Sequence, residues 1–437
     1  MLIRIYLGFL LLAAIPAWSQ VEPSATGPPP PLEEAMRTPP PVSGETYPST
    51  TGSEMRSNEL WGGLNFQTAY DNDALEGSVP IAELTYSIKP TIALDRLTPR
   101  LHQTFTYSPG FTFYERTTSR NEVDQNASAE FQAQLSPHAA VSVRDLFHRS
   151  TNVFNQSFAG VSGSTQPLTD GIIAPFAANY GNAASADVSY QFGPNGMIGG
   201  GGTSAIVNYL DPAQAGGLSN SNSRGGSAFY NLRLSSAQYA GVIYQYSKMS
   251  ADSTIGGSET NTNTIFGFYT LYLKRTLSIS VSAGPQHFDA INPLLHGTAS
   301  WTPAATASVG WQRSRVNYAA SYSRSVSGSV GLLGAFQSNF ANGSARWQFA
   351  RTWTVGLTAS YADFKNVTPL FLGSSPGGHA ISGTASIQHP IGQRFLAEIG
   401  YARVDQRFSG VEALSTEPVS DREYISISYN FKRPLGR

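Results

Sequence analysis

The residues of this chain that could carry out catalysis are few and scattered. Asp145 and His148 lie three residues apart, and Ser150 and Ser157 follow them. A carboxylate, an imidazole and a hydroxyl can activate a nucleophile, but a triad depends on geometry rather than on nearness in sequence. The seven His residues show no spacing typical of metal ligands, and Cys is absent. We therefore expect no enzyme, no metal site and no cofactor.

A second group of reactive side chains consists of single charges, set among Ser, Thr, Gly, Gln and Asn. Two interpretations remain open for them. The arginines pair with Glu130, Asp187 and Glu398 on neighbouring strands and stiffen a wall, or the opposed charges form a transverse field that selects solutes. The candidates expected to line a lumen are Glu83, Glu130, Arg144, Asp187, Arg233, Lys274, Arg346 and Glu398.

The segments that must position these charges alternate strictly between apolar and polar residues. In residues 424–431, Ile425, Ile427, Tyr429 and Phe431 alternate with Tyr424, Ser426, Ser428 and Asn430. Strand side chains alternate between two faces, so one face is apolar and the other is rich in hydroxyls. The same pattern recurs at 127–135, 186–192, 277–284 and 353–361. This alternation, with few charges and no long apolar run, is typical of a lipid-embedded β-barrel.

The connections between these segments alternate in length. Short ones fall at 97–100, 136–138, 193–196, 235–238, 274–276, 313–315, 351–352 and 389–393. Longer ones rich in Gly, Ser, Asn and Asp fall near 71–78, 116–122, 150–181, 210–225, 250–262, 289–297, 325–338, 365–378 and 408–421. The pattern predicts an all-β fold, a transmembrane antiparallel up-and-down β-barrel of about eighteen strands with short periplasmic turns and long outer loops.

Two of the expected strands contain proline, which strands tolerate at edges, bulges and ends. Pro80 and Pro90 lie in 79–95, and Pro303 lies in 298–312, so sixteen strands is the alternative. Aromatic residues near the long-loop ends predict an interfacial girdle, since such rings favour the membrane–water boundary. The girdle residues are Tyr70, Tyr114, Tyr246, Tyr322, Tyr361 and Tyr401.

The N-terminal residues indicate export. Arg4, the apolar run 5–15 and the small-x-small site Ala17-Trp18-Ser19 predict a signal peptide over residues 1–19. Residues 20–57 are rich in Pro and poor in aliphatic residues, which predicts a disordered periplasmic leader. The leader either has no partner or docks a periplasmic one. We expect the barrel over 58–431 and a short periplasmic extension over 432–437.

The terminal strand ending Tyr429-Asn430-Phe431 resembles the C-terminal strand of bacterial outer-membrane proteins, although Lys432 to Arg437 follow it. That resemblance implies binding by the barrel-assembly machinery and integration in the outer membrane, beside lipid and lipopolysaccharide. Residues 282–286, 300–304 and 433–437 resemble a group of large outer-membrane barrels, some of which accompany exopolysaccharide export. With a net charge of -1, the chain shows no signature of nucleic-acid binding.

These observations predict a porin-like channel for hydrophilic solutes, with polysaccharide export as a variant. The alternative is a surface structural or adhesion barrel with a closed lumen. The long connection 150–181 is unusually apolar, which predicts that it folds into the barrel and narrows it, or else forms an exposed patch for a partner. Its candidate constriction residues are Phe154, Phe158, Ile172 and Phe176.

Overall fold

The computed structural model describes residues 58–72, 81–118, 121–150, 178–210, 218–252, 257–274, 276–292, 295–328, 334–368, 377–409 and 419–434. The described residues form eighteen strands, which confirms the expected number and excludes sixteen. The expected signal peptide 1–19 and leader 20–57 lie outside the described ranges.

The strands follow one another along the chain as a single meander. Their bounds are β1 Glu59–Asp71, β2 Glu83–Thr98, β3 Leu101–Tyr114, β4 Glu122–Gln134, β5 Ala139–Ser150, β6 Asn179–Phe192, β7 Gly196–Tyr209, β8 Asn220–Ser235, β9 Gln238–Asp252, β10 Ser258–Lys274, β11 Leu277–Asn292, β12 Leu295–Arg313, β13 Val316–Gly328, β14 Ala335–Gln348, β15 Thr354–Asn366, β16 Gly377–Ile391, β17 Phe395–Ser409 and β18 Val419–Pro434.

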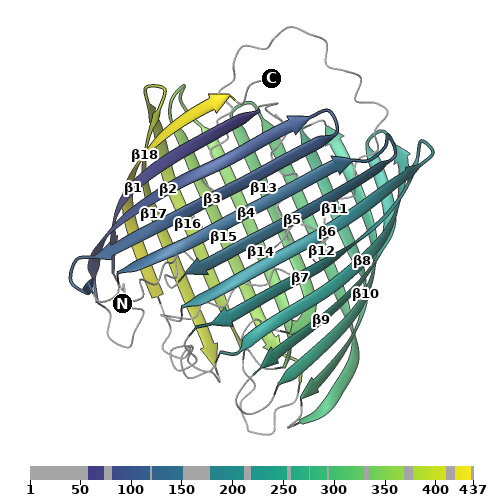
Figure 1. Cartoon of the computed structure of the whole chain (residues 1–437). Helices are drawn as coiled ribbons and strands as arrows, with labels where there is room; N and C mark the ends of the chain where they lie inside the picture. Colours follow the sequence, from purple (N-terminus) through teal and green to yellow (C-terminus); the bar gives the residue numbers. More distant parts are fainter. Residues whose placement is uncertain are drawn as a thin grey trace.

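Each strand pairs antiparallel with its neighbours in sequence, and β1 also pairs with β18. Figure 1 shows the resulting cylinder of tilted strands, with β1 beside β18. Closure joins the two edges that an open sheet would leave, so their backbone groups find partners in the β1–β18 ladder. The fold is therefore the closed up-and-down barrel expected from the alternating pattern.

The alternation places apolar side chains on the outer surface. In β18, Ile425 is 58% exposed and Ile427 48%, whereas Ser426 between them is 3% exposed. The same parity holds for the expected outward residues Phe131, Val188 and Leu357, which are all exposed. An apolar outer face suits hydrocarbon, because lipid offers no hydrogen bonds to polar side chains. No helix in the described ranges is long and apolar enough to cross a membrane.

Aromatic side chains ring the outer surface near both ends of the barrel. Five of the six tyrosines expected in the girdle are exposed: Tyr70, Tyr246, Tyr322, Tyr361 and Tyr401. The expectation for Tyr114 was wrong. Its strand parity turns it inward, where it is 6% exposed and its hydroxyl donates to Glu122, while its neighbour Phe113 faces outward.

A second aromatic band, which the sequence analysis missed, lies at the short-turn end. Trp311 stacks on Tyr318 with ring centroids 5.6 Å apart, and Phe395 lies 5.1 Å from Tyr429. Two girdles fit the two membrane–water interfaces.

The strands reach further into the connections than their composition suggests. The connection expected near 289–297 is only 293–294, because β11 and β12 pair as far as Asn292 and Leu295. At the other end, β18 continues to Pro434 instead of ending at Phe431, because Pro434 is paired with Glu59 of β1.

The proline-containing segments are accommodated as strands. Between β2 and β3 the ladder lapses from Ile88–Phe111 to Ile92–Tyr107, where Pro90 and Pro109 each lack an N–H. Hydroxyl bonds bridge the lapse on both sides, with Thr91 Oγ1 and Ser108 Oγ 2.9 Å apart, and Ser87 Oγ and Thr112 Oγ1 3.1 Å apart.

The seam between the first and last strands carries a buried ion pair. Asp71 and Arg422 face each other across β1 and β18, and both side chains are almost fully buried. Arg422 Nε donates to Asp71 Oδ1 at 2.9 Å and Nη2 to Oδ2 at 2.6 Å. This planar, two-bond geometry is the strongest form of an arginine–carboxylate contact.

We expect Asp71→Ala to lower the free energy of unfolding by about 3–5 kcal/mol, because it leaves the guanidinium buried without its carboxylate. The measurement is urea unfolding of the barrel in lipid vesicles. Lys248→Met is the control, since Lys248 and Glu259 form an exposed pair 2.7 Å apart whose loss should cost less than about 1 kcal/mol. Equal losses in the two variants would contradict a special role for the seam.

Candidate functional site

The inner wall of the barrel is a surface of paired hydroxyls. On the face opposite the exposed apolar residues, side-chain oxygens of adjacent strands meet at hydrogen-bond distance. Thr358 and Thr384 are 2.6 Å apart, and Ser282 and Thr306 also 2.6 Å. Further pairs are Ser360–Ser382 and Thr270–Ser280. Hydroxyls can both donate and accept, so this wall can exchange bonds with water and with polar solutes.

Of the eight charges expected to line the lumen, Lys274 follows a bulge in β10 and lies opposite Leu277, on the outward parity of β11, so it does not share the inward parity. The other seven fall on the inward parity of their strands. Each is flanked by outward apolar neighbours: Val143 beside Arg144, Val188 beside Asp187, and Ile399 beside Glu398 are all exposed. That these charges contact a solute remains a prediction. The full set lies on eight strands: Glu83 on β2, Glu130 on β4, Arg144 on β5, Asp187 on β6, Arg233 on β8, Lys274 on β10, Arg346 on β14 and Glu398 on β17.

Among the described strand residues, inward acids and bases gather on different parts of the wall. The strands β17, β18 and β1 to β4 carry eight inward carboxylates and, where side chains are described, two inward bases, Lys89 and Arg422; the acids are Glu59, Asp71, Glu83, Asp95, Glu122, Asp124, Glu130 and Glu398. The wall from β5 to β14 carries the inward bases Arg144, Arg233 and Arg346 with the acid Asp187. Most inward acids and most inward bases therefore lie on different arcs of the barrel wall.

Some of these charges are also cross-strand neighbours, as the stiffening interpretation requires. Glu130 lies directly opposite Arg144 in the β4–β5 register, and Gln132 Nε2 donates to Glu130 Oε1 at 2.6 Å. On β17 and β18, Tyr424 donates its hydroxyl to Glu398 Oε1 at 3.0 Å. The structure is therefore compatible both with charge pairs that stiffen the wall and with charges that select solutes.

One predicted lumen residue has a different local role. Glu83 is 1% exposed and accepts hydrogen bonds from the backbone N–H groups of Arg116 and Thr117, the latter at 2.7 Å. The Thr117 hydroxyl donates to its other carboxylate oxygen at 2.6 Å. Glu83 therefore holds the β3–β4 connection against the mouth of the barrel.

A buried charge cluster beside the seam was not foreseen from the sequence. Lys89, Glu122, Asp124 and Arg422 interact electrostatically on the inner face of β18 and β2 to β4. Each is nearly fully buried. Asp124 also accepts a bond from the Ser150 hydroxyl at 3.1 Å. Continuing the alternation back from Ala127 to Glu122 would have placed both acids on the inner face.

Gly110 of β3 makes room for this cluster. It lies opposite Asp124 in the register and beside the lapse caused by Pro90 and Pro109. A Cβ at this position would stand 3.4 Å from Lys89 Cγ and 3.5 Å from Asp124 Oδ2. The side chains of β2 and β4 therefore meet across β3 where that strand has none.

The opposite part of the long-loop mouth is apolar and crosses the lumen. A cluster of buried residues joins Val207 and Tyr209 of β7 and Leu218 to Phe336 of β14. β7 and β14 are separated by six strands in the sheet order, so the contact is made through the interior. Phe336 is fully buried. The remaining members are Phe340, Ala362, Phe364 and Phe408.

The structure does not assemble the catalytic triad considered above. Asp145 lies on the outward parity of β5 and accepts a bond from Asn182 Nδ2 at 2.7 Å. His148 lies on the inward parity, over Gly181 of β6. Ser157 and the constriction residues Phe154, Phe158, Ile172 and Phe176 lie outside the described residues, so the constriction loop stays a prediction.

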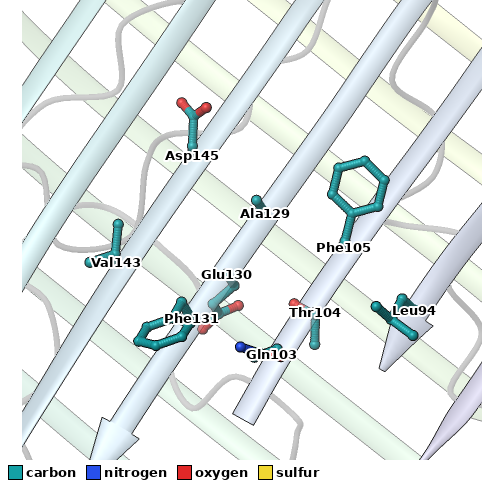
Figure 2. A pocket seen from close by; sticks show the side chains of 9 residues that line it. All are labelled: Leu94, Gln103, Thr104, Phe105, Ala129, Glu130, Phe131, Val143 and Asp145. Atoms are coloured by element: carbon teal, nitrogen blue, oxygen red, sulfur yellow. The ribbon is translucent and has the colours of Figure 1, made fainter. Parts of the chain in front are cut away.

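The described residues contain no group of three or more His, Cys, Asp or Glu side chains placed to hold a metal ion. A depression of about 290 Å³ lies on the outward side of β2 to β5. It surrounds Ala129, whose small side chain sits between the larger Phe105, Phe131 and Val143 (Figure 2). Its mainly apolar lining faces the same side as the lipid-exposed residues and offers no catalytic arrangement.

No family model and no curated protein matches this sequence. Among solved structures, OccAB2 of Acinetobacter baumannii aligns over 86% of this chain and 98% of its own, with 8% sequence identity and a TM-score of 0.43. OccK2 (OpdF) of Pseudomonas aeruginosa gives the same four values. The siderophore receptor PirA of Pseudomonas aeruginosa aligns over 86% of this chain and 81% of its own, with 12% identity and a TM-score of 0.39. Similarity at this level carries no conclusion about what this chain does.

We expect Gly110→Leu to lower the free energy of unfolding by about 1–3 kcal/mol, because its branches would push Lys89 and Asp124 apart. Gly110→Ala is the matched control: its Cβ fits at ordinary contact distance, so its effect should stay within about 1 kcal/mol. Urea unfolding in vesicles measures both variants. If leucine proves as neutral as alanine, the cluster does not depend on the space above Gly110.

Proposed function

We propose that this protein is a passive channel of the bacterial outer membrane through which hydrophilic solutes diffuse. The observation that carries the proposal is the separation of its two faces: an apolar outer wall between two aromatic girdles, and an inner wall of paired hydroxyls and charges. Barrels of this strand number have room inside for an aqueous passage. A barrel that served only as an anchor would have no use for such a wall.

The orientation follows from the connections. Outer-membrane barrels place their short turns in the periplasm and their longer loops outside. In this orientation the acidic cluster and the apolar cluster both lie at the outer mouth. Arg233, Lys274 and Arg346 lie toward the periplasmic ends of their strands. We further propose that the signal peptide exports the chain and that the barrel-assembly machinery binds β18, whose Phe431 is exposed on the outer face.

The division of charge favours solutes that carry both signs or a strong dipole. At the periplasmic end, the carboxylates of Glu59, Asp95, Glu130 and Glu398 lie on a different arc of the wall from the guanidinium groups of Arg233 and Arg346. A solute between these two arcs would experience a field across the passage. The orientation of a solute's dipole would then affect its passage more strongly than the solute's net charge does. The proposed role is passage without catalysis.

Sugars are a natural solute class for a wall of hydroxyls, since both sides can donate and accept hydrogen bonds. Export of a polysaccharide is the finer form of this proposal. Block of single-channel current by added oligosaccharides, with block lengthening as the chain grows, would support it.

We expect the purified barrel to conduct ions in planar bilayers and its ion selectivity to follow the wall charges. Glu130→Gln should move the reversal potential in a salt gradient toward anion selectivity. Arg233→Gln with Arg346→Gln should move it the opposite way, because charged groups on a narrow passage enrich their counterions. Asp145→Asn, on the outward parity of β5, is the control and should leave the potential unchanged.

Unchanged potentials in all the inward variants would mean that these residues do not line the path. No conductance in any variant, combined with loop-dependent binding to cells, would favour the closed structural or adhesion barrel instead.

A further inference from the structure

The ladder between β12 and β13 stops half-way along β12. The two strands pair from Arg313–Val316 to Ala305–Arg324, and β12 then continues to Leu295 without a partner on that side. On its other side β12 stays paired with β11 as far as Leu295. Within the described residues, β12 beyond Ala305 is therefore paired on one side alone, as is β13 beyond Arg324.

The end of β13, which would pair with this edge of β12, turns into the barrel instead. After Arg324, β13 remains paired with β14 up to Gly328–Ala335, and β14 remains paired with β15. The end of β13 contacts β9, β10 and β11, although β12 lies between β13 and β11 in the sheet order. The two arms of the β13–β14 hairpin, 325–328 and 334–337, thus lie over the inner face of the neighbouring wall. We call them the hairpin arms.

Beyond the end of the β12–β13 ladder, a glutamine side chain bonds the backbone groups of β13 that would otherwise point to β12. Gln286, on the inner face of β11, accepts a bond from the Val326 N–H at 2.7 Å and donates to the Val326 carbonyl at 2.9 Å. In an antiparallel strand both backbone groups of one residue point to the same side. Since β14 occupies the other side of β13, Gln286 occupies the position that β12 would otherwise fill.

Two more contacts hold the hairpin arms in place. The Gly334 N–H donates to Ser258 Oγ of β10 at 3.3 Å, at a residue whose φ of 109° suits glycine. Val326 and Ala335 pack on Phe288 and Ala290 of β11 in a second buried cluster. The first cluster, with Phe336, then spans the interior to β7.

The inward arms and the free edge of β12 are complementary. The existing register places Ala305 opposite Arg324, and each further step outward pairs the next residue of β13 with the preceding residue of β12. Continued in this way, Ser325 would face Ala304, and Ser327 would face Thr302. Both members of these two pairs would lie on the inner face. Between them Val326 would face Pro303, whose carbonyl can accept a bond from the Val326 N–H but which has no N–H to donate in return. A backbone edge without partners is costly, especially near lipid, so the free edge of β12 favours this exchange.

We propose that the hairpin arms are a gate that exchanges one set of backbone bonds for another. In the closed state, which this structure shows, Gln286 and the two apolar clusters hold the arms across the outer mouth. In the open state β13 pairs with β12 up to Trp301, and Phe336 leaves the lumen with its strand. Apolar constrictions close passages by excluding water as well as by filling space.

Paired cysteines test the strand exchange without interference, since the chain contains no cysteine of its own. Thr302→Cys with Ser327→Cys should form a disulfide on mild oxidation, because the open register brings these positions opposite each other. Loss of labelling by a maleimide reports the disulfide. Ser308→Cys with Ser321→Cys is the matched control, since these residues are already paired.

Conductance in planar bilayers tests the gate itself, which rests on the proposed channel function. The oxidised Thr302→Cys, Ser327→Cys variant should conduct about twofold more than its reduced form, and the oxidised control should not change. Gln286→Cys with Val326→Cys should show the reverse: bridging the two thiols with a short bifunctional reagent should restore a low conductance. Phe336→Ala should raise the conductance, whereas Trp347→Ala, on the outward parity of the same strand, should leave it unchanged.

The outcomes separate the two proposals. If both thiols of the Thr302→Cys, Ser327→Cys variant stay fully labelled while the control oxidises, the strands do not exchange and the gate is wrong. A disulfide that leaves conductance equal to that of the reduced form overturns the gating role. If the disulfide forms but no variant of the barrel conducts, the strand exchange occurs. In that case the proposed channel function is wrong, and the gating role fails with it.

Discussion

Closure of the sheet is the constraint on which the rest of this structure depends. Eighteen strands in a barrel can satisfy their backbone groups only if the last strand returns to the first, and the β1–β18 ladder runs from Glu59–Pro434 to Asp71–Arg422. The buried ion pair at its end, with two hydrogen bonds, fixes the register there. If β1 and β18 slipped by one residue relative to each other, Asp71 and Arg422 would point to opposite faces of the sheet. The apolar residues of the two strands would then no longer share one face.

The same constraint explains where polar side chains gather. Strand parity leaves the outer face to apolar residues, so nearly every charge in the barrel wall must face inward or lie near the ends of the strands. Inside, charges meet neighbours that neutralise them, as Lys89 does with Asp124 and Glu122. Prolines and a glycine mark this cluster, because Pro90 and Pro109 interrupt one ladder and Gly110 leaves space between the strands. The polar wall and the irregular backbone therefore belong to one feature.

The outer mouth combines two surfaces of different chemistry. The strands next to the seam present acids and hydroxyls, while β7, β14, β15 and β17 present the apolar cluster that crosses the interior. Departure of β13 from β12 creates the second surface and leaves an edge behind. In the proposed gate, the free edge of β12 favours opening, since the open state forms backbone bonds between β12 and β13 that the closed state lacks.

The sequence by itself determined the architecture: strand number, the position of most turns, and which residues face lipid. This was possible because a two-residue period is local, and the apolar outer face repeats it in every strand, as in Ile425, Ile427 and Tyr429. It also placed seven of the eight candidate charges on the inner parity, whereas the bulge in β10 places Lys274 opposite the outward Leu277. It failed for Tyr114, and it missed the cluster around Glu122 and Asp124, where loop-like composition concealed the ends of strands. Only the tertiary structure decided which charges meet, that Glu83 clamps a connection, and that β13 leaves its neighbour to lie across the mouth. Those features depend on contacts between residues far apart in sequence, such as the bonds of Gln286 with Val326 and the apolar cluster that joins β7 to β14, which no local period encodes.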